Sequence, residues 1–523
     1  MKARRSVARG CGVVRPSSCR RLWLAVGAAV VFCAADGHAA NEDDFLRPVG
    51  RPPVAAPQRR QGGEALPPLP LPATPLRRSE KKRPPSPATL IGKVVWGSYL
   101  DYTWDDGQVT RVYDWNMVPA DCQQVLRAAR EHLGLEYKAE TTNLQTFNAT
   151  PAEMPVLHFS GGRSLKFSDR DRETLRKYLL AGGTVWFDSV VGSPYFYKSA
   201  LEELGHILPE SPPRRIPPDH PVFHMIQDAV KVSTRTESDV PPVLEGVYIG
   251  SRLAAVVSPF GLGVGWDNAS PHLIPDANFY DAKSSYLLGL NLVAYAVGYF
   301  RVGQSHARAD TYRAEDLVDN PDALVFAQLR TNGVWNTEPG AAGNLLRYLD
   351  RNLQVKASYL KKAVTAGRDP LDAYAFLYLS GITDFQFSPE ERAALRDYVL
   401  KGGYLLVDNS LGLSEFDRAA RGELARIFGD DCLTRVPADH PVFTAGPYPM
   451  AAANYTLAVR ARNPDLKTPW LEGVRIQDEY RVFYSPMDLA AGWQGDDHPL
   501  ACGYAPGDAL QMGANLVTFF MTH

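Results

Sequence analysis

Two copies of one domain follow each other in this chain, and this duplication constrains the fold more than any other feature. The motif Asp-His-Pro-Val-Phe occupies residues 219–223 and, 220 residues later, residues 439–443. With the same offset, residues 157–189 align with residues 377–409, and 13 of these 33 aligned pairs are identical. Repeated segments that keep a constant offset indicate a repeated structural unit.

The alignment continues beyond the motif with a slightly larger offset. Leu-Glu-Gly-Val at residues 244–247 recurs 227 residues later at residues 471–474, and shorter matches follow in the same order. The length of 523 residues also exceeds what a single hydrophobic core usually serves. The sequence therefore predicts two domains of the same fold, at residues 91–302 and 308–523.

The amino terminus has the composition of an export signal. Seven basic residues precede an apolar run at residues 22–35, and the small residues Gly37 and Ala39 follow it. This pattern predicts a signal peptide over residues 1–39 and a periplasmic or secreted protein. The alternative is a retained membrane anchor, although 14 apolar residues are fewer than the roughly 20 that span a bilayer. An Arg-Arg pair in the leader leaves general and twin-arginine export both open.

A proline-rich segment separates the leader from the first domain. Twelve prolines lie between residues 46 and 90, interleaved with basic residues. This composition predicts a disordered, partly polyproline II linker over residues 40–90. Because residues 1–90 carry a net charge of +10 and the whole chain carries −2, residues 91–523 carry −12. The acidic charge argues against a nucleic-acid partner, and no transmembrane span is predicted after signal cleavage.

Each copy alternates strand and helix patterns. Residues 154–160 and 374–380 are apolar runs followed by a glycine, which is typical of buried strands. A helix pattern follows in each copy, capped by Ser168 or Asp169 in the first and by Ser388 in the second. Strand–helix–strand units with short connections indicate parallel pairing. The sequence therefore predicts two tandem three-layer α/β domains with mostly parallel sheets, flavodoxin-like or class I amidotransferase-like.

Several motifs of the second copy resemble a bacterial family. LRTNGVWNTEP, FLYLSG and VFYSPMDLAAGWQG are similar to the family catalogued as domain of unknown function 4159, over nearly all of residues 325–523. The first copy lacks the first-strand pattern and has VVSPFGLGVGWD in place of the Tyr-Ser-Pro-x-Asp-Leu motif. More distantly, the series Leu-Arg-x-Tyr, Gly-Gly and His-Pro resembles the glutamine-amidotransferase-like superfamily and its trehalose-utilisation branch. That resemblance implies a site at the carboxyl ends of the strands.

The turns where such enzymes carry their nucleophile hold no cysteine. Residues 188–192 read Asp-Ser-Val-Val-Gly and residues 408–412 read Asp-Asn-Ser-Leu-Gly, without a Gly-x-Cys-x-Gly or Gly-x-Ser-x-Gly elbow. The sequence therefore argues against glutaminase chemistry. It predicts no cofactor, and no metal ion, because it has no Cys/His cluster with metal-ligand spacing. Cys432 and Cys502 either form a disulfide or remain free thiols.

Residues that occur in both copies, or at expected strand ends, are the candidates for a site. A histidine beside an aspartate suggests a general base, although a His-Pro pair next to two apolar residues favours a structural turn. The strand-end aspartates lie where doubly wound sheets bind ligands. The catalytic candidates are Asp408, His440 and Asp488. The ligand-binding candidates are Asp188, His220, Ser380, Glu472 and Trp493.

Two functions fit these observations. The first is an exported, non-catalytic module that binds a carbohydrate ligand or an exported partner protein, in line with the duplication and the missing nucleophile. The alternative is a periplasmic hydrolase that acts on a carbohydrate or peptide bond in the second domain. The hydrolase requires Asp408, His440 and Asp488 to converge in one cleft within hydrogen-bond reach.

Overall fold

A computed structural model describes residues 40–51, 86–308, 323–359, 361–496 and 498–523. The predicted signal peptide, residues 1–39, lies outside the described residues, as do residues 52–85 of the predicted linker. Residues 40–523 belong to one compact unit that contains both repeats.

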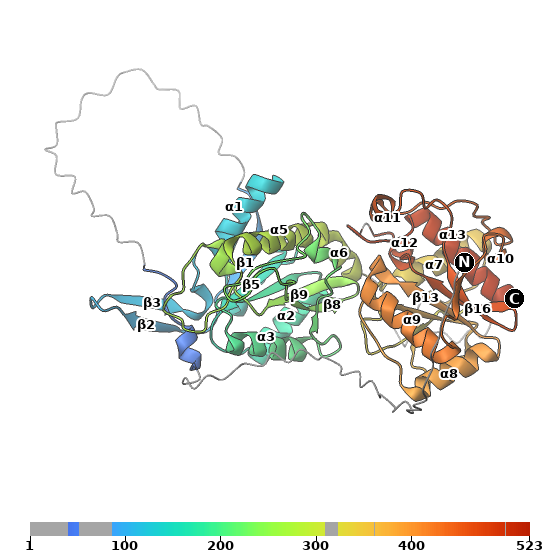
Figure 1. Ribbon diagram of the computed structural model, residues 1–523, viewed down its shortest axis with the longest axis horizontal. Helices are drawn as coiled ribbons and strands as arrows, with labels where there is room; N and C mark the ends of the chain where they lie inside the picture. Colours follow the sequence, from blue (N-terminus) through green and yellow to red (C-terminus); the bar gives the residue numbers. More distant parts are fainter. Residues whose placement is uncertain (1–39, 52–85, 309–322, 360, 497) are drawn as a thin grey trace, which may run out of the picture. The chain divides into compact units, whose positions relative to one another are not determined.

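The first repeat is a three-layer α/β domain (Figure 1). Its sheet strands are β1 (Ala88–Val94), β4 (Tyr137–Thr142), β5 (Val156–Gly161), β6 (Thr184–Ser189), β7 (Arg214–Arg215), β8 (Glu245–Ile249) and β9 (Arg252–Ser258). A separate hairpin consists of β2 (Tyr99–Thr103) and β3 (Val109–Tyr113). The helices are α1 (Asp121–Leu133), α2 (Asp169–Leu180), α3 (Pro194–Ile207), α4 (Gly263–Trp266), α5 (Ala282–Gly298) and α6 (Phe300–Arg308). The strand order is β4-β1-β5-β6-β9-β8-β7, with β7 and β8 antiparallel at one edge.

The second repeat has the same architecture. Its strands are β10 (Ala327–Leu329), β11 (Lys362–Val364), β12 (Phe376–Gly381), β13 (Tyr404–Asn409), β14 (Leu433–Arg435), β15 (Glu472–Ile476) and β16 (Glu479–Ser485). Its helices are α7 (Ala341–Leu353), α8 (Pro389–Leu400), α9 (Ser414–Phe428), α10 (Pro441–Thr444), α11 (Leu457–Arg462), α12 (Ala490–Gln494) and α13 (Pro506–Thr522). The strand order β11-β10-β12-β13-β16-β15-β14 repeats that of the first sheet. In both sheets the five parallel strands follow the order 2-1-3-4-5, which is the flavodoxin-like order.

The strands of each sheet bury side chains on both faces. In the second repeat, Tyr378 and Leu406 face an apolar core that includes residues of α7 and α13. Their neighbours Leu377 and Leu405 face a second core that includes residues of α8 and α9. Successive side chains of a strand point to opposite faces, so a strand covered on both sides must be apolar almost throughout. The predicted three-layer α/β fold is confirmed in both repeats.

Helices α2 and α8 begin where the sequence predicts. Ser168 and Ser388 each accept a hydrogen bond from the backbone N–H of the third helical residue, whose own carboxylate accepts from the serine N–H. These reciprocal bonds form a capping box, which satisfies two backbone donors that a helix start leaves free. Pro389 occupies the first position of α8, where a missing N–H costs nothing.

The first repeat has a first strand, although its sequence lacks the family pattern there. Gly92 of β1 pairs with Leu157 as Ala327 of β10 pairs with Leu377, so β1 and β10 are equivalent. The offset at this point is 235 residues, because the β2–β3 hairpin lengthens the connection after β1. An alignment at the constant offset of 220 therefore cannot reach β1.

Residues 40–51 differ from the extended linker that the sequence predicts for them. Phe45 and Leu46 are buried in an apolar cluster that includes valines from the turn after β6. Asp43 forms a 2.9 Å ion pair with Arg163. The linker prediction rested on proline content, and only one of the twelve prolines falls within this segment. Its apolar residues anchor it to the first repeat.

Neither a disulfide nor a membrane-spanning helix occurs among the described residues. Cys122, Cys432 and Cys502 are free thiols. Cys502 lies in the core on the α7–α13 face of the second sheet, while Cys432 packs beside the core on the α8–α9 face. The sheet separates the two cysteines that could have paired. In the part of the chain that the structure describes, no helix is long and apolar enough to cross a bilayer.

Candidate functional site

The strand-end aspartates Asp188 and Asp408 each cap a short helix. Both oxygens of Asp188 accept 2.7 Å hydrogen bonds from backbone N–H groups at the start of α4. Both oxygens of Asp408 accept 3.0 Å bonds from backbone N–H groups at the start of α12, and Oδ2 also accepts from the Tyr378 hydroxyl at 2.7 Å. Burial raises the pKa of Asp188 to about 6; burial and the neighbouring Asp488 raise the pKa of Asp408 well above its usual value. The fold itself uses both carboxyl groups.

Asp488 lies beside Asp408 and holds the turn that follows β13. Its two oxygens accept hydrogen bonds from the backbone N–H groups of Leu411 at 2.7 Å and Ala491 at 3.0 Å. Burial, with a contribution from the Glu338 carboxylate, raises the pKa of Asp488 to about 6. Leu411 has a φ of 58°, so the strained position of the turn after the strand holds a buried leucine rather than a nucleophile.

The histidines of the repeated motif lie apart from these aspartates. The Nδ1 atoms of His220 and His440 each accept a hydrogen bond from the backbone N–H two residues later, at 3.1 and 3.2 Å. The His440 ring packs on Tyr480, five residues before the residue of β16 that pairs with Asp408. Five residues of a strand span about 16 Å. The three catalytic candidates therefore do not share one cleft, as the hydrolase hypothesis requires.

The remaining candidates from the sequence are also engaged in the fold. The Ser380 hydroxyl is buried and donates to the carbonyl of Trp335 at 2.9 Å. Glu472 on β15 forms a 2.6 Å ion pair with Arg421. Trp493 is 1% exposed and its Nε1 donates to a carbonyl of α13 at 2.8 Å. A buried indole offers no surface on which a sugar could stack.

The first repeat covers the carboxyl end of the second sheet. The backbone N–H of Ser251, in the β8–β9 turn, donates to the carbonyl of Thr337 at 2.5 Å, and the Ser251 hydroxyl donates to the Glu338 carboxylate. The hydroxyl of Tyr299 donates to the carbonyl of Pro499 at 2.6 Å. Doubly wound sheets bind ligands at this end. The interface between the repeats is therefore the place to look for a site.

A buried ionic cluster lies at this interface. Glu338 faces two imidazoles: His306 of α6 lies 3.0 Å away and His498 lies 3.2 Å away, measured from Nε2 to the carboxylate oxygens. Burial alone would raise the pKa of Glu338, but the two histidines hold it well below its usual range. Burial alone would lower the pKa of His498, but Glu338, with Asp488 and Asp496, raises it to about 9.

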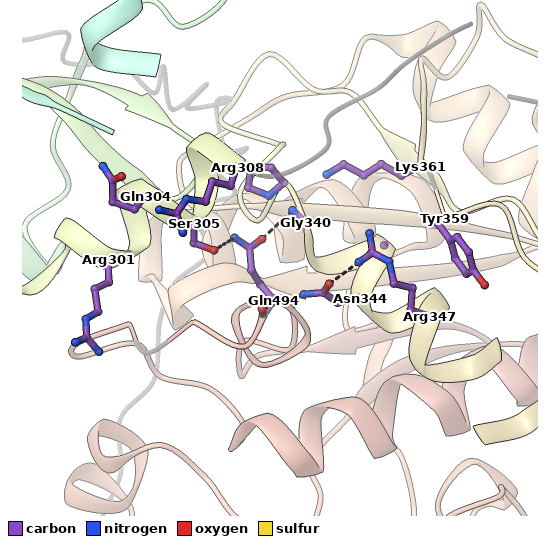
Figure 2. A pocket seen from close by; sticks show the side chains of 12 residues that line it. Arg301, Gln304, Ser305, Arg308, Gly340, Asn344, Arg347, Tyr359, Lys361 and Gln494 are labelled. Carbon is purple, nitrogen blue, oxygen red and sulfur yellow. Dashed lines mark hydrogen bonds between the residues drawn. The ribbon is translucent and has the colours of Figure 1, made fainter. Parts of the chain in front are cut away.

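A cleft of about 570 Å³ opens between the two repeats (Figure 2). Its basic side chains are Arg301 and Arg308 from α6, Arg347 from α7 and Lys361 from the residue before β11. We call this the basic cleft; its other side chains that bear on binding are Gln304, Ser305, Asn344, Tyr359 and Gln494. None of the described residues that line it is acidic. In Figure 2 the α6 residues lie on one side, Arg347 and Tyr359 lie on the other, and Gln494 lies between them.

Three arginines of the basic cleft have no carboxylate partner among the described residues. Among the described residues, Arg301, Arg308 and Arg347 form no ion pair; Arg347 donates to the side-chain oxygen of Asn344 at 2.8 Å. Arg392, by contrast, forms a 2.7 Å ion pair with a glutamate of α9. Unpaired guanidinium groups in a concave site attract anions.

None of the residues of the basic cleft was a candidate from the sequence. They come from α6, α7 and the approach to β11, without a motif that joins them. For the neighbouring ionic cluster, the sequence does hold a signal, which is a difference between the two copies: Glu338 aligns with Val118 at the offset of 220. A buried charge in one copy against an apolar residue in the other marks a place where the copies do different things.

A family model described as Domain of unknown function (DUF4159) matches the chain twice, at residues 102–297 and 325–521. No curated protein matches the chain. The two matches fall on the two repeats and together cover well over half of the sequence. The chain therefore belongs to the DUF4159 family and carries two tandem copies of its domain.

Proposed function

We propose that the protein is an exported, non-catalytic binding module that holds an acidic saccharide in the basic cleft. The observation that carries this proposal is a set of three arginines in a cleft between the repeats that have no carboxylate partner among the described residues. A guanidinium group presents paired N–H donors that match a carboxylate or phosphate. A negatively charged ligand would give these three arginines the anionic partner that Arg392 has in its glutamate.

The other residues of the basic cleft favour a saccharide over a bare anion. The side-chain nitrogen of Gln304 donates to the carbonyl of Ala181 at 3.1 Å, while its side-chain oxygen can accept from a sugar hydroxyl. The Tyr359 side chain is 41% exposed and gives an apolar face at the same opening. A volume of about 570 Å³ suits a ligand of one to a few sugar rings.

A binding role also agrees with the way the fold uses its acidic residues. Asp408 and Asp488 are occupied by backbone N–H groups, and His440 lies at the far end of β16. Hydrolysis would need a free acid and base on either side of one bond. These contacts favour the binding module over the hydrolase.

Calorimetric titration with an oligogalacturonate and with glucose 6-phosphate tests this function. We expect at least one of them to bind, while a neutral disaccharide does not, and we expect added salt to weaken binding. Arg347→Ala is expected to raise the dissociation constant at least about tenfold, because it removes a charge-assisted contact. Arg368→Ala is the matched control, since Arg368 is exposed and lies outside the cleft. Equal binding of the neutral sugar, or no effect of Arg347→Ala, would contradict the proposal.

Export forms a second part of this proposal, with its own test. The basic leader, apolar run and small residues before residue 40 support cleavage after Ala39. Amino-terminal sequencing of the protein from a periplasmic or culture fraction is expected to begin at Ala40. Ala39→Arg is expected to leave the leader attached, because a bulky residue at the cut blocks processing. Recovery of the full-length chain from the cytosol alone would count against export.

A further inference from the structure

Four side chains with metal-binding atoms meet where the two repeats join. His306 belongs to α6 of the first repeat, and Glu338, Asp496 and His498 belong to the second. One ligand atom from each of the four lies within 4.8 Å of all the others. His306, Glu338 and His498 are more than nine-tenths buried. The group is therefore a closed cluster rather than a collection of surface charges.

The donor set matches a transition metal better than an alkaline-earth ion. Two imidazole nitrogens and two carboxylates are ligands that Zn²⁺ accepts in a tetrahedral arrangement, at about 2.0–2.2 Å. Ligands at that distance lie roughly 3–4 Å from one another. The carboxylate of Glu338 is already 3.0 Å from Nε2 of His306 and 3.2 Å from Nε2 of His498. Small side-chain shifts would bring these atoms around one ion.

His498 gives an independent reason to expect a ligand. Its side chain is buried, and neither ring nitrogen has a hydrogen-bond partner among the described residues. Nε2 is close to the Glu338 carboxylate without the alignment of a hydrogen bond. A buried polar group without a partner is costly, so such groups are rare in folded proteins. A metal ion beside Nε2 would supply the missing partner.

Neighbouring groups form hydrogen bonds with three of the four proposed ligands and orient them. Groups behind the ligands of known metal sites do the same. Nδ1 of His306 donates to the carbonyl of Ile249 at 3.2 Å, so a metal ion would bind Nε2, which lies 3.0 Å from the Glu338 carboxylate. Asp496 accepts a 2.9 Å hydrogen bond from the side chain of Gln494. The Ser251 hydroxyl donates to Glu338. Three of the four ligands are thus oriented by a neighbour.

A second group of potential ligands in the first repeat already has its cation. Asp121, Cys122 and His158 also lie together, but Nζ of Lys93 is 2.8 and 2.9 Å from the two oxygens of Asp121. A lysine ammonium in that place competes with any metal.

We propose that His306, Glu338, Asp496 and His498 together bind one divalent transition-metal ion with the ligand preferences of Zn²⁺. The ion joins α6 of the first repeat to the loops of the second and so fixes the two repeats against each other. The sequence predicts no metal ion, because these four ligands are spread from residue 306 to residue 498 without a recognisable spacing. The two proposals are tested with different ligands and different variants, so each can fail without the other.

Titration of the chelator-treated full chain with zinc chloride tests the site. We expect one ion per chain with a dissociation constant of about 1 µM or lower. His306→Gln and His498→Gln are each expected to weaken binding at least about tenfold. His272→Gln is the matched control, because His272 is exposed and far from the cluster in the chain. Arg347→Ala is expected to bind zinc as the unaltered protein does.

X-ray absorption of the zinc-loaded, unaltered protein gives a readout that needs no variant. We expect nitrogen and oxygen neighbours at about 2.0 Å with the outer scattering of two imidazoles. If a glutamine variant loses its circular-dichroism spectrum, this measurement decides the question alone. Three results would overturn the proposal. They are no binding at about 100 µM zinc, folded glutamine variants that bind zinc as tightly as the unaltered protein, and an absorption spectrum that shows sulfur or a single imidazole.

Discussion

Replacing Asp408 with alanine is expected to lower the free energy of unfolding by about 3 kcal/mol. The carboxylate accepts hydrogen bonds from the backbone N–H groups of Leu489 and Ala490 and from the Tyr378 hydroxyl. All three donors would lose their acceptor in a buried place, and each costs about 1–3 kcal/mol unless water enters. Urea unfolding followed by tryptophan fluorescence measures the difference.

Asp397→Ala is the matched control for this prediction. Asp397 lies on the exposed side of α8 in the same repeat, so its loss should change stability by no more than about 0.5 kcal/mol. Asp408→Asn should fall between the two, because the amide keeps one acceptor oxygen but turns a donor toward the second N–H group. If Asp408→Ala is as stable as Asp397→Ala, the carboxylate does not act as a cap, and its role as a ligand contact returns to consideration.

The sequence predicts the fold well because each level of the chain indicates the same answer. Apolar runs of strand length, serine caps and helix-ending glycines occur in both copies, so the central strands and helices are indicated twice. Ser388, Glu391 and Pro389 illustrate this, since the predicted cap and the observed capping box coincide. The sequence does not predict β1, because the added hairpin changes the offset between the copies there.

Repetition is also the reason why the candidate site was not predicted. Residues shared by both copies are those that each copy needs in order to fold: Asp188 and Asp408 cap helices, and Trp266 and Trp493 fill cores. A site formed between the copies must use residues that differ. The alignment of Glu338 with Val118 is such a difference. The sequence alone does not show that Glu338 lies at the contact between the repeats, because this depends on which surface of the first repeat meets the second.

Acid is expected to destabilise the protein through His220. Burial lowers the pKa of His220 to about 3; Asp219 opposes this effect and His224 adds to it. In the unfolded chain a histidine titrates near 6.5. Between about pH 6.5 and 3 the unfolded chain therefore binds a proton that the folded chain does not. The stability that His220 contributes is complete above about pH 6.5 and is lost as the pH falls toward 3.

The measurement compares urea unfolding of the unaltered protein and of His220→Asn at pH 7 and pH 4.5. Asparagine can still cap the following turn, as His220 Nδ1 does, but it does not titrate. At two pH units below 6.5, at about 1.4 kcal/mol per unit, the unaltered protein should lose about 2–3 kcal/mol more than the variant. The raised pKa values of Asp188, Asp408 and Asp488 act in the opposite direction, but they are common to both proteins and cancel in the comparison.

The result separates a structural histidine from a general base. A base that works near neutral pH needs a pKa near 7, which is close to that of a histidine in the unfolded chain. If His220 were such a base, the free energies of unfolding of the two proteins would change almost equally between pH 7 and pH 4.5. His272→Asn, at an exposed position, should follow the unaltered protein at both pH values. If the unaltered protein and His220→Asn lose the same free energy of unfolding between pH 7 and pH 4.5, the buried ring takes up a proton as easily as a free histidine. If the two proteins differ in this loss, the Asp-His-Pro-Val-Phe motif of the first repeat packs a neutral ring against Tyr248 and Tyr295.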